Sequence, residues 1–109
     1  MAKGNEEVPE LTNGEFEKFV KEGVVLIDFF TEWGMPCLMM APVVEELAGE
    51  FRGKIKFGKV NVDDNQKIAE KFHVSSIPTF ILFKEGNPIE QFVGSMAHEE
   101  FGEKLKEFI

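Results

Sequence analysis

The stretch from Asp28 to Cys37 reads DFFTEWGMPC, and the hydrophobic period of the chain changes within it. On its N-terminal side, the run from Val24 to Phe30 is almost continuously apolar, which is typical of a central strand buried on both faces. On its C-terminal side, apolar residues recur at helical spacing from Cys37 to Phe51. The stretch therefore predicts a buried strand, a short loop and a long helix.

Strands and helices alternate along the rest of the chain. A short edge strand is expected over 8–11, with further strands over 55–62, 79–84 and 89–93, and helices over 12–22, after Asp63 and after a capping Ser95. The turn at 85–87 should pair the last two strands antiparallel. This order, β-α-β-α-β-α-β-β-α, predicts an α/β fold with a central mixed β-sheet and helices on both faces. We expect one domain over residues 8–109, after a flexible N-terminal segment of residues 1–7.

Composition and charge argue against several classes of protein. The chain has 20 acidic and 12 basic residues, a net charge of -8, and so offers no cationic face to nucleic acid or to an anionic membrane. Cys37 is the only cysteine, and one cysteine with two distant histidines does not make a zinc site. The N-terminus lacks the apolar region of a signal peptide. We therefore expect a cytoplasmic protein without nucleic-acid, membrane or metal binding.

Four strings, in this order along the chain, resemble the thioredoxin family. They are DFFTEWGMPC at 28–37, KVNVD at 59–63, SIPTF at 76–80 and FVG at 92–94. The resemblance covers about residues 8–109 and implies the thioredoxin fold. The family motif is Trp-Cys-x-Pro-Cys, which Trp33, Pro36 and Cys37 match. Gly34 stands where the family has its nucleophilic cysteine.

The resemblance implies a protein-disulfide oxidoreductase that acts by thiol–disulfide exchange in cell redox homeostasis. It implies no cofactor, disulfide-containing proteins as substrates, and a thioredoxin reductase as the source of electrons. In the family mechanism, a thiolate at the helix N-terminus attacks the substrate disulfide, and the second thiol resolves the mixed disulfide. Because Gly34 cannot attack, we expect this chain to be redox-impaired. The otherwise intact motif favours an engineered substitution.

The resemblance also assigns roles to residues around the thiol. Cys37 would be the resolving thiol, although the residues themselves favour a small buried hydrophobe at this position. Asp28 would be a buried acid and base, with Lys59 as its partner, and a structural buried ion pair is the alternative for both. Burial should make Asp28 titrate above an ordinary aspartate.

Substrate-binding roles are implied for a second set of residues, which comprises Trp33, Met35, Pro36, Ile77, Pro78 and Gly94. Ile77-Pro78 resembles the cis-proline loop of the family, along which a substrate peptide pairs as an added strand; an ordinary trans turn is the alternative. Trp33 would form an exposed rim rather than part of the core. Gly94 would leave room for substrate, or serve only as a turn glycine. Met39 and Met40 are expected in the core.

Two other functions stay open at this point. One is a natural non-catalytic module that binds peptides in the same groove, as a chaperone or as a subunit of a complex. The other is a monothiol protein that uses Cys37 in mixed disulfides. We expect a monomer, with a Cys37-linked or non-covalent dimer as the alternative.

Overall fold

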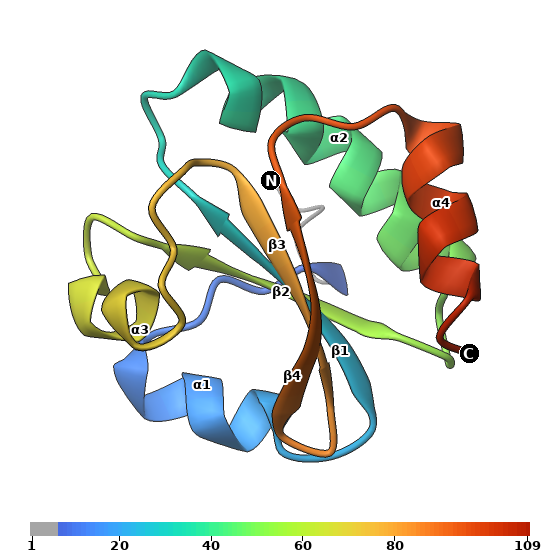
Figure 1. The fold of residues 1–109 in the computed structure, drawn as a ribbon, viewed down its shortest axis with the longest axis horizontal. Coiled ribbons are helices and arrows are strands. Elements are labelled where there is room, and N and C mark those ends of the chain that lie inside the picture. The colour runs from blue at the N-terminus through green and yellow to red at the C-terminus, as the bar shows by residue number, and fades with distance from the viewer. Residues whose placement is uncertain (1–6) are drawn as a thin grey trace.

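The computed structural model describes residues 7–109, which form a sheet enclosed between two pairs of helices (Figure 1). In chain order the elements are α1 (Asn13–Val20), β1 (Val24–Phe30), α2 (Met35–Glu50), β2 (Lys56–Asn61), α3 (Gln66–Lys71), β3 (Thr79–Lys84), β4 (Asn87–Val93) and α4 (His98–Lys106). The strand order is β2-β1-β3-β4. Strand β1 pairs parallel with β2 and antiparallel with β3, and β3 pairs antiparallel with β4. This is the mixed α/β sheet of the thioredoxin fold that the sequence predicts.

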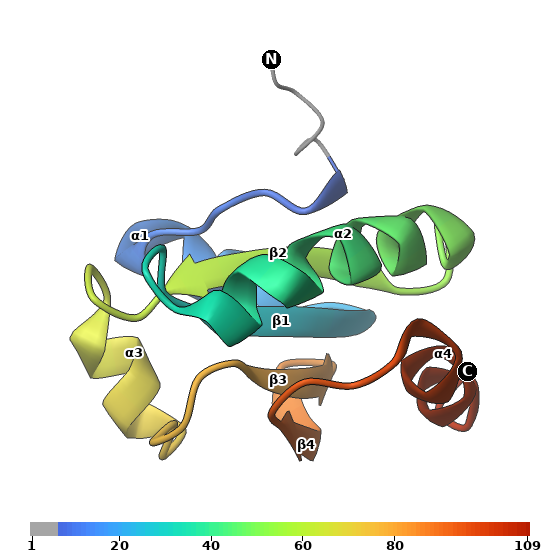
Figure 2. The same ribbon diagram turned by 90° about the horizontal axis from the view of Figure 1, so that it is seen from above.

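Each face of the sheet has its own hydrophobic core. Helices α2 and α4 cover one face and α1 and α3 the other, and Figure 2 shows α4 beside the C-terminal part of α2. Leu26 of β1 packs toward α2 and α4, whereas Val25, Ile27 and Phe29 pack toward α1 and α3. Because side chains alternate along a strand, Asp28 shares the Leu26 face. The one acidic residue of β1 therefore lies on the side of the sheet that α2 covers.

The prediction of a first strand over residues 8–11 is wrong, because this segment does not form a strand. Residues 8–11 make a single isolated parallel bridge, between Glu10 and Lys59. The Lys59 N–H donates to the Pro9 carbonyl at 2.9 Å, and the Leu11 N–H donates to the Lys59 carbonyl at 2.8 Å. Pro9 has no N–H of its own, so the pairing does not extend. Of the expected flexible segment, residues 1–6 lie outside the described residues, and Glu7 forms an ion pair with Arg52.

The expected cap of the last helix is also wrong. Helix α4 begins at His98, with Ala97 rather than Ser95 at its N-cap. The Met96 N–H points to Met40 Sδ at 3.4 Å, so the chain leading to α4 first packs against α2. Since that contact is between distant residues, the capping preference of Ser95 alone did not reveal it.

Gly58 provides a test of the packing between β2 and α1. A Cβ built on Gly58 would lie 2.9 Å from both Leu11 Cδ1 and Phe19 Cε2. Gly58→Ala is therefore expected to lower the free energy of unfolding by about 2 kcal/mol through overpacking, as measured by urea denaturation. The matched control is Gly14→Ala in α1, where an added Cβ meets nothing within 4 Å; it should be neutral or stabilise by up to about 1 kcal/mol. Equal stability of the two variants would contradict this packing.

Candidate functional site

The candidate site lies where β1 ends and α2 begins. Strand β1 ends at Phe30, and residues 31–34 form the loop to α2, whose N-cap is Gly34. Pro36 occupies the first turn, where its fixed φ suits a helix and its missing N–H has no intrahelical partner to lose. Cys37 follows in the same turn, facing the sheet. The sequence GMPC thus sets a helix N-terminus directly above the carboxyl end of β1.

Cys37 is a buried thiol, 7% exposed. The Thr31 main-chain N–H points to its Sγ at 3.5 Å. Burial raises the pKa of Cys37, and the Asp28 carboxylate raises this pKa further, whereas the Thr31 N–H lowers it. The thiol is therefore protonated at neutral pH, which agrees with the expected burial and with low intrinsic reactivity.

Gly34 faces Cys37 across the first turn of α2. A Cβ built on Gly34 would lie 3.6 Å from Cys37 Sγ, so a side chain at position 34 would point toward the thiol. In a disulfide, the Cβ of one cysteine lies about 3 Å from the sulfur of the other. A cysteine at position 34 would therefore reach Cys37 with only a small adjustment. The same Cβ would lie 2.9 Å from Thr31 Oγ1. A larger residue at position 34 therefore requires Thr31 to move.

Asp28 and Lys59 are directly opposite each other in the parallel register of β1 and β2. Asp28 is 7% exposed, and its Oδ1 has no hydrogen-bond partner among residues 7–109. Burial raises the pKa of Asp28 to about 7, and the charge of Lys59 acts in the opposite direction. Lys59 Nζ instead lies 5.4 Å from the centre of the Phe30 ring.

A direct Asp28–Lys59 ion pair is therefore not formed. None of the salt bridges within residues 7–109 joins the two groups. The buried ion pair that was the structural alternative for these two residues is therefore not present, although the charge of Lys59 still acts on Asp28. What the structure places beneath α2 is a largely buried carboxyl that titrates in the neutral range, with a half-buried lysine as its neighbour.

The loop before β3 carries a cis peptide bond between Ile77 and Pro78. The Pro78 carbonyl accepts a hydrogen bond from the Gly94 N–H at 2.8 Å, which joins this loop to the end of β4. Gly94 has a φ of +92°, a conformation that side chains rarely adopt. A Cβ there would meet nothing within 4 Å, so backbone conformation, more than space, accounts for this glycine.

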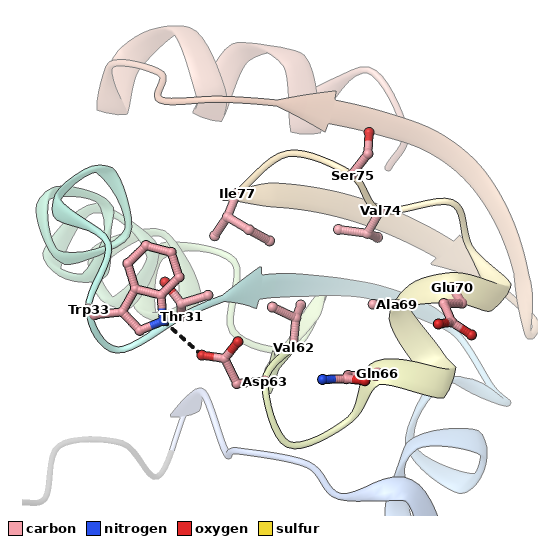
Figure 3. A pocket seen from close by; sticks show the side chains of 10 residues that line it. All are labelled: Thr31, Trp33, Val62, Asp63, Gln66, Ala69, Glu70, Val74, Ser75 and Ile77. Carbon is pink, nitrogen blue, oxygen red and sulfur yellow. Dashed lines mark hydrogen bonds between the residues drawn. The ribbon is translucent and has the colours of Figure 1, made fainter.

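Trp33 lies at the rim of a cavity of about 340 Å³ on the α3 side of the thiol (Figure 3). Its side chain is 78% exposed, which excludes a core position. The indole Nε1–H donates to Asp63 Oδ2 at 2.9 Å. Ile77 lines the same cavity, so the structure brings the cis-proline loop and the tryptophan to one hollow.

A second hollow, of about 520 Å³, lies on the α4 side of the thiol. Met35, Pro36, Met39 and Met96 are among its lining residues. The core position expected for Met39 is wrong, because its side chain is 66% exposed, whereas Met40 is buried as expected. Helical spacing explains the difference, since Met40 shares the inward face of α2 with Cys37 and Met39 does not.

Sequence reasoning missed Thr31 and the partner of Trp33. Asp63 follows β2 and Trp33 follows β1, and these strands are parallel neighbours. Because the carboxyl ends of parallel strands meet at one edge of a sheet, their following residues are close in space; that rule was the available signal for Asp63. No comparable signal marked Thr31, whose position depends on the fold of the loop.

The comparisons with known proteins agree with this geometry. The thioredoxin family model matches residues 7–107. The chain is 44% identical to a thioredoxin of Staphylococcus haemolyticus over 98 residues, which is 90% of this chain and 94% of the relative. It is 41% identical to a thioredoxin of Staphylococcus saprophyticus over 102 residues, 94% of this chain and 98% of the relative. Within residues 7–109, no helix has the length and apolar character needed to cross a membrane. The chain belongs to the thioredoxin family.

Proposed function

We propose that this chain is a thioredoxin-type protein-disulfide oxidoreductase in which the position of the nucleophile is vacant. The observation that carries the proposal is the direction of residue 34, whose Cβ would point to Cys37 Sγ at 3.6 Å. A thiol there would lie at a helix N-terminus, where the unpaired N–H groups and the helix dipole favour a thiolate. With glycine at this place, the chain docks disulfide-containing proteins but does not begin the exchange.

The resolving half of the chemistry is assigned to Cys37 and Asp28. A resolving thiol must lose its proton before it attacks a mixed disulfide. The buried Asp28 carboxyl, whose pKa is about 7, can accept or return that proton at neutral pH. Lys59 assists as the nearest cationic neighbour in the register and opposes the full effect of burial on the carboxyl. An engineered change at position 34 of an active parent accounts for a site that is otherwise complete.

The substrate groove is assigned to the surface around the thiol. It comprises Trp33, Met35, Pro36, Ile77, Pro78 and Gly94, which border the two hollows or brace the loop between them. An extended peptide would pair with the backbone beside Ile77 as an added strand. The proposed partners are disulfide-containing proteins and a thioredoxin reductase. We also propose one domain over residues 8–109, a monomer, and a cytoplasmic location.

One observation favours a second function, a natural non-catalytic binding module. Thr31 Oγ1 already lies 2.9 Å from the place that a Cβ of residue 34 would take, so the loop is fitted to glycine. Such a module would hold peptides in the same groove as a chaperone or as a subunit of a complex. The two functions differ in whether a cysteine at position 34 restores exchange.

Docking is tested by titrating the unaltered chain with a disulfide-containing peptide in a calorimeter. We expect saturable binding, and Trp33→Ala is expected to weaken it about tenfold, because exposed aromatic anchors carry much of the binding energy at such surfaces. The matched control is Ile89→Ala, an exposed apolar residue at the opposite end of β4 from the site. Absence of binding, or equal effects of the two variants, would contradict the proposed groove.

A further inference from the structure

Thr31 carries a buried hydroxyl that no other group in the described part of the chain satisfies. Its side chain is 2% exposed, and Oγ1 has no hydrogen-bond partner within residues 7–109. Only one other buried side-chain atom among the described residues shares this condition, Asp28 Oδ1. Buried polar groups without partners are uncommon and cost free energy. The two unpartnered oxygens belong to the two residues whose groups act on the Cys37 thiol.

Thr31 lies next to the thiol and also lines the cavity beside Trp33. The Thr31 N–H points to Cys37 Sγ at 3.5 Å, so Thr31 already contacts the sulfur through its main chain. Its Oγ1 lies 2.9 Å from the Cβ position of residue 34, which is itself 3.6 Å from the same sulfur. Figure 3 shows Thr31 and Trp33 among the side chains that line this cavity.

We propose that Thr31 is a positioning residue whose hydroxyl donates a hydrogen bond to the sulfur of Cys37 when that sulfur is a thiolate. A hydroxyl hydrogen rotates to suit its surroundings. The neutral thiol is a weak acceptor, whereas a thiolate is a strong one, and hydrogen bonds to charged groups are the stronger kind. The threonine proton stays on oxygen, and the thiol proton goes to the Asp28 carboxylate or to solvent.

In this arrangement Thr31 supplies two donors to one sulfur, its N–H and its hydroxyl. The inference rests on the proposed resolving role of Cys37, but its test needs no disulfide exchange. Its failure can therefore be told apart from failure of the proposed function.

The other charged groups near Cys37 stay constant when Thr31 is changed. Asp28 of β1 opposes the thiolate, and Lys59 of β2 acts on Asp28. Asp63, which follows β2, accepts a hydrogen bond from the Trp33 indole. The first turn of α2 has no acidic residue, and residues 94–97, which lead to α4, carry no charge. A comparison of variants at Thr31 thus isolates the hydroxyl.

The test is the pH dependence of Cys37 alkylation by iodoacetamide, followed by mass spectrometry. Thr31→Val keeps the branched shape and removes the hydroxyl, whereas Thr31→Ser keeps the hydroxyl. We expect the alkylation midpoint to rise by about one pH unit in Thr31→Val, because a donor to the charged form is lost. Thr31→Ser should restore the midpoint of the unaltered chain.

Two results would overturn the proposal: equal midpoints for Thr31→Val and the unaltered chain, or equal shifts in Thr31→Val and Thr31→Ser. Thiolate absorbance in the ultraviolet, measured on the same variants, gives the midpoint independently of reagent access. If Thr31→Val does not fold, Thr31→Ala takes its place against Thr31→Ser, with the same expectations for the midpoint.

Discussion

Replacement of Gly34 by cysteine is expected to raise the rate of protein-disulfide reduction about 10³-fold or more over that of the unaltered chain. The magnitude follows from the loss usually seen when a catalytic nucleophile is removed from a site that is otherwise intact. The new thiol would be within disulfide reach of Cys37, since the Cβ of residue 34 points to its sulfur. The measurement is the reduction of a protein disulfide with a chemical reductant supplied in excess.

Two further variants serve as controls in this experiment. Gly34→Ser has nearly the size of cysteine without its thiol, so it should stay inactive. Gly34→Cys combined with Thr31→Ala removes the oxygen that lies 2.9 Å from the new Cβ. It should also be more active than the unaltered chain, but less active than Gly34→Cys, because the Cys37 thiolate loses the hydroxyl that we propose stabilises it. Recovery only in the double variant would show that Thr31 blocks the position. Failure of both cysteine variants, with the fold intact, would contradict the proposed oxidoreductase and favour the binding module.

Asp28→Asn is expected to stabilise the protein by about 3 to 4 kcal/mol near pH 8 and to have little effect near pH 3. In the unfolded chain the carboxyl loses its proton near pH 3.8, whereas in the fold its pKa is about 7. Between about pH 4 and pH 7, the Asp28 carboxyl is ionised in the unfolded chain but still protonated in the folded chain. The free energy of unfolding therefore falls as the pH rises from about 4 to about 7, and it levels off above that range.

Urea denaturation of Asp28→Asn across this pH range measures the effect. The matched control is Asp64→Asn, because Asp64 is an exposed aspartate close after β2 and its removal should change stability by less than about 0.5 kcal/mol at each pH. An Asp28→Asn effect that did not change with pH would show that the carboxyl titrates alike in the folded and unfolded chains. That result would remove Asp28 as a proton acceptor at neutral pH.

The sheet and its helices could be predicted from local sequence patterns. The predictions failed where contacts between residues distant in the sequence determine the structure. The apolar run at 24–30 and the helical spacing after it specify β1 and α2, because both elements bury nearly every residue that the pattern marks. By contrast, the segment at Glu10 forms a single bridge to Lys59. Pro9 has no N–H with which to extend the pairing. The start of α4 depends on the contact between Met96 and Met40.

The predictions for the site succeeded or failed for the same reason. Burial of Cys37 and the upward pKa shift of Asp28 follow from position in a first helical turn and in a buried strand, and both were predicted. The exposure of Met39 also follows from helical spacing, and it was misjudged from residue type. The hydroxyl of Thr31 could not be placed, because its direction depends on how the loop closes over Gly34.

The most direct measurement of the central claim is a count of thiols released when the unaltered chain is saturated with a disulfide-containing peptide. We expect bound peptide, no thiol release beyond that of the peptide alone, and an unmodified Cys37 by mass spectrometry. Release of one thiol for each chain, with the peptide joined to Cys37, would show that this buried thiol begins the exchange by itself. That result would contradict a docking site without its nucleophile.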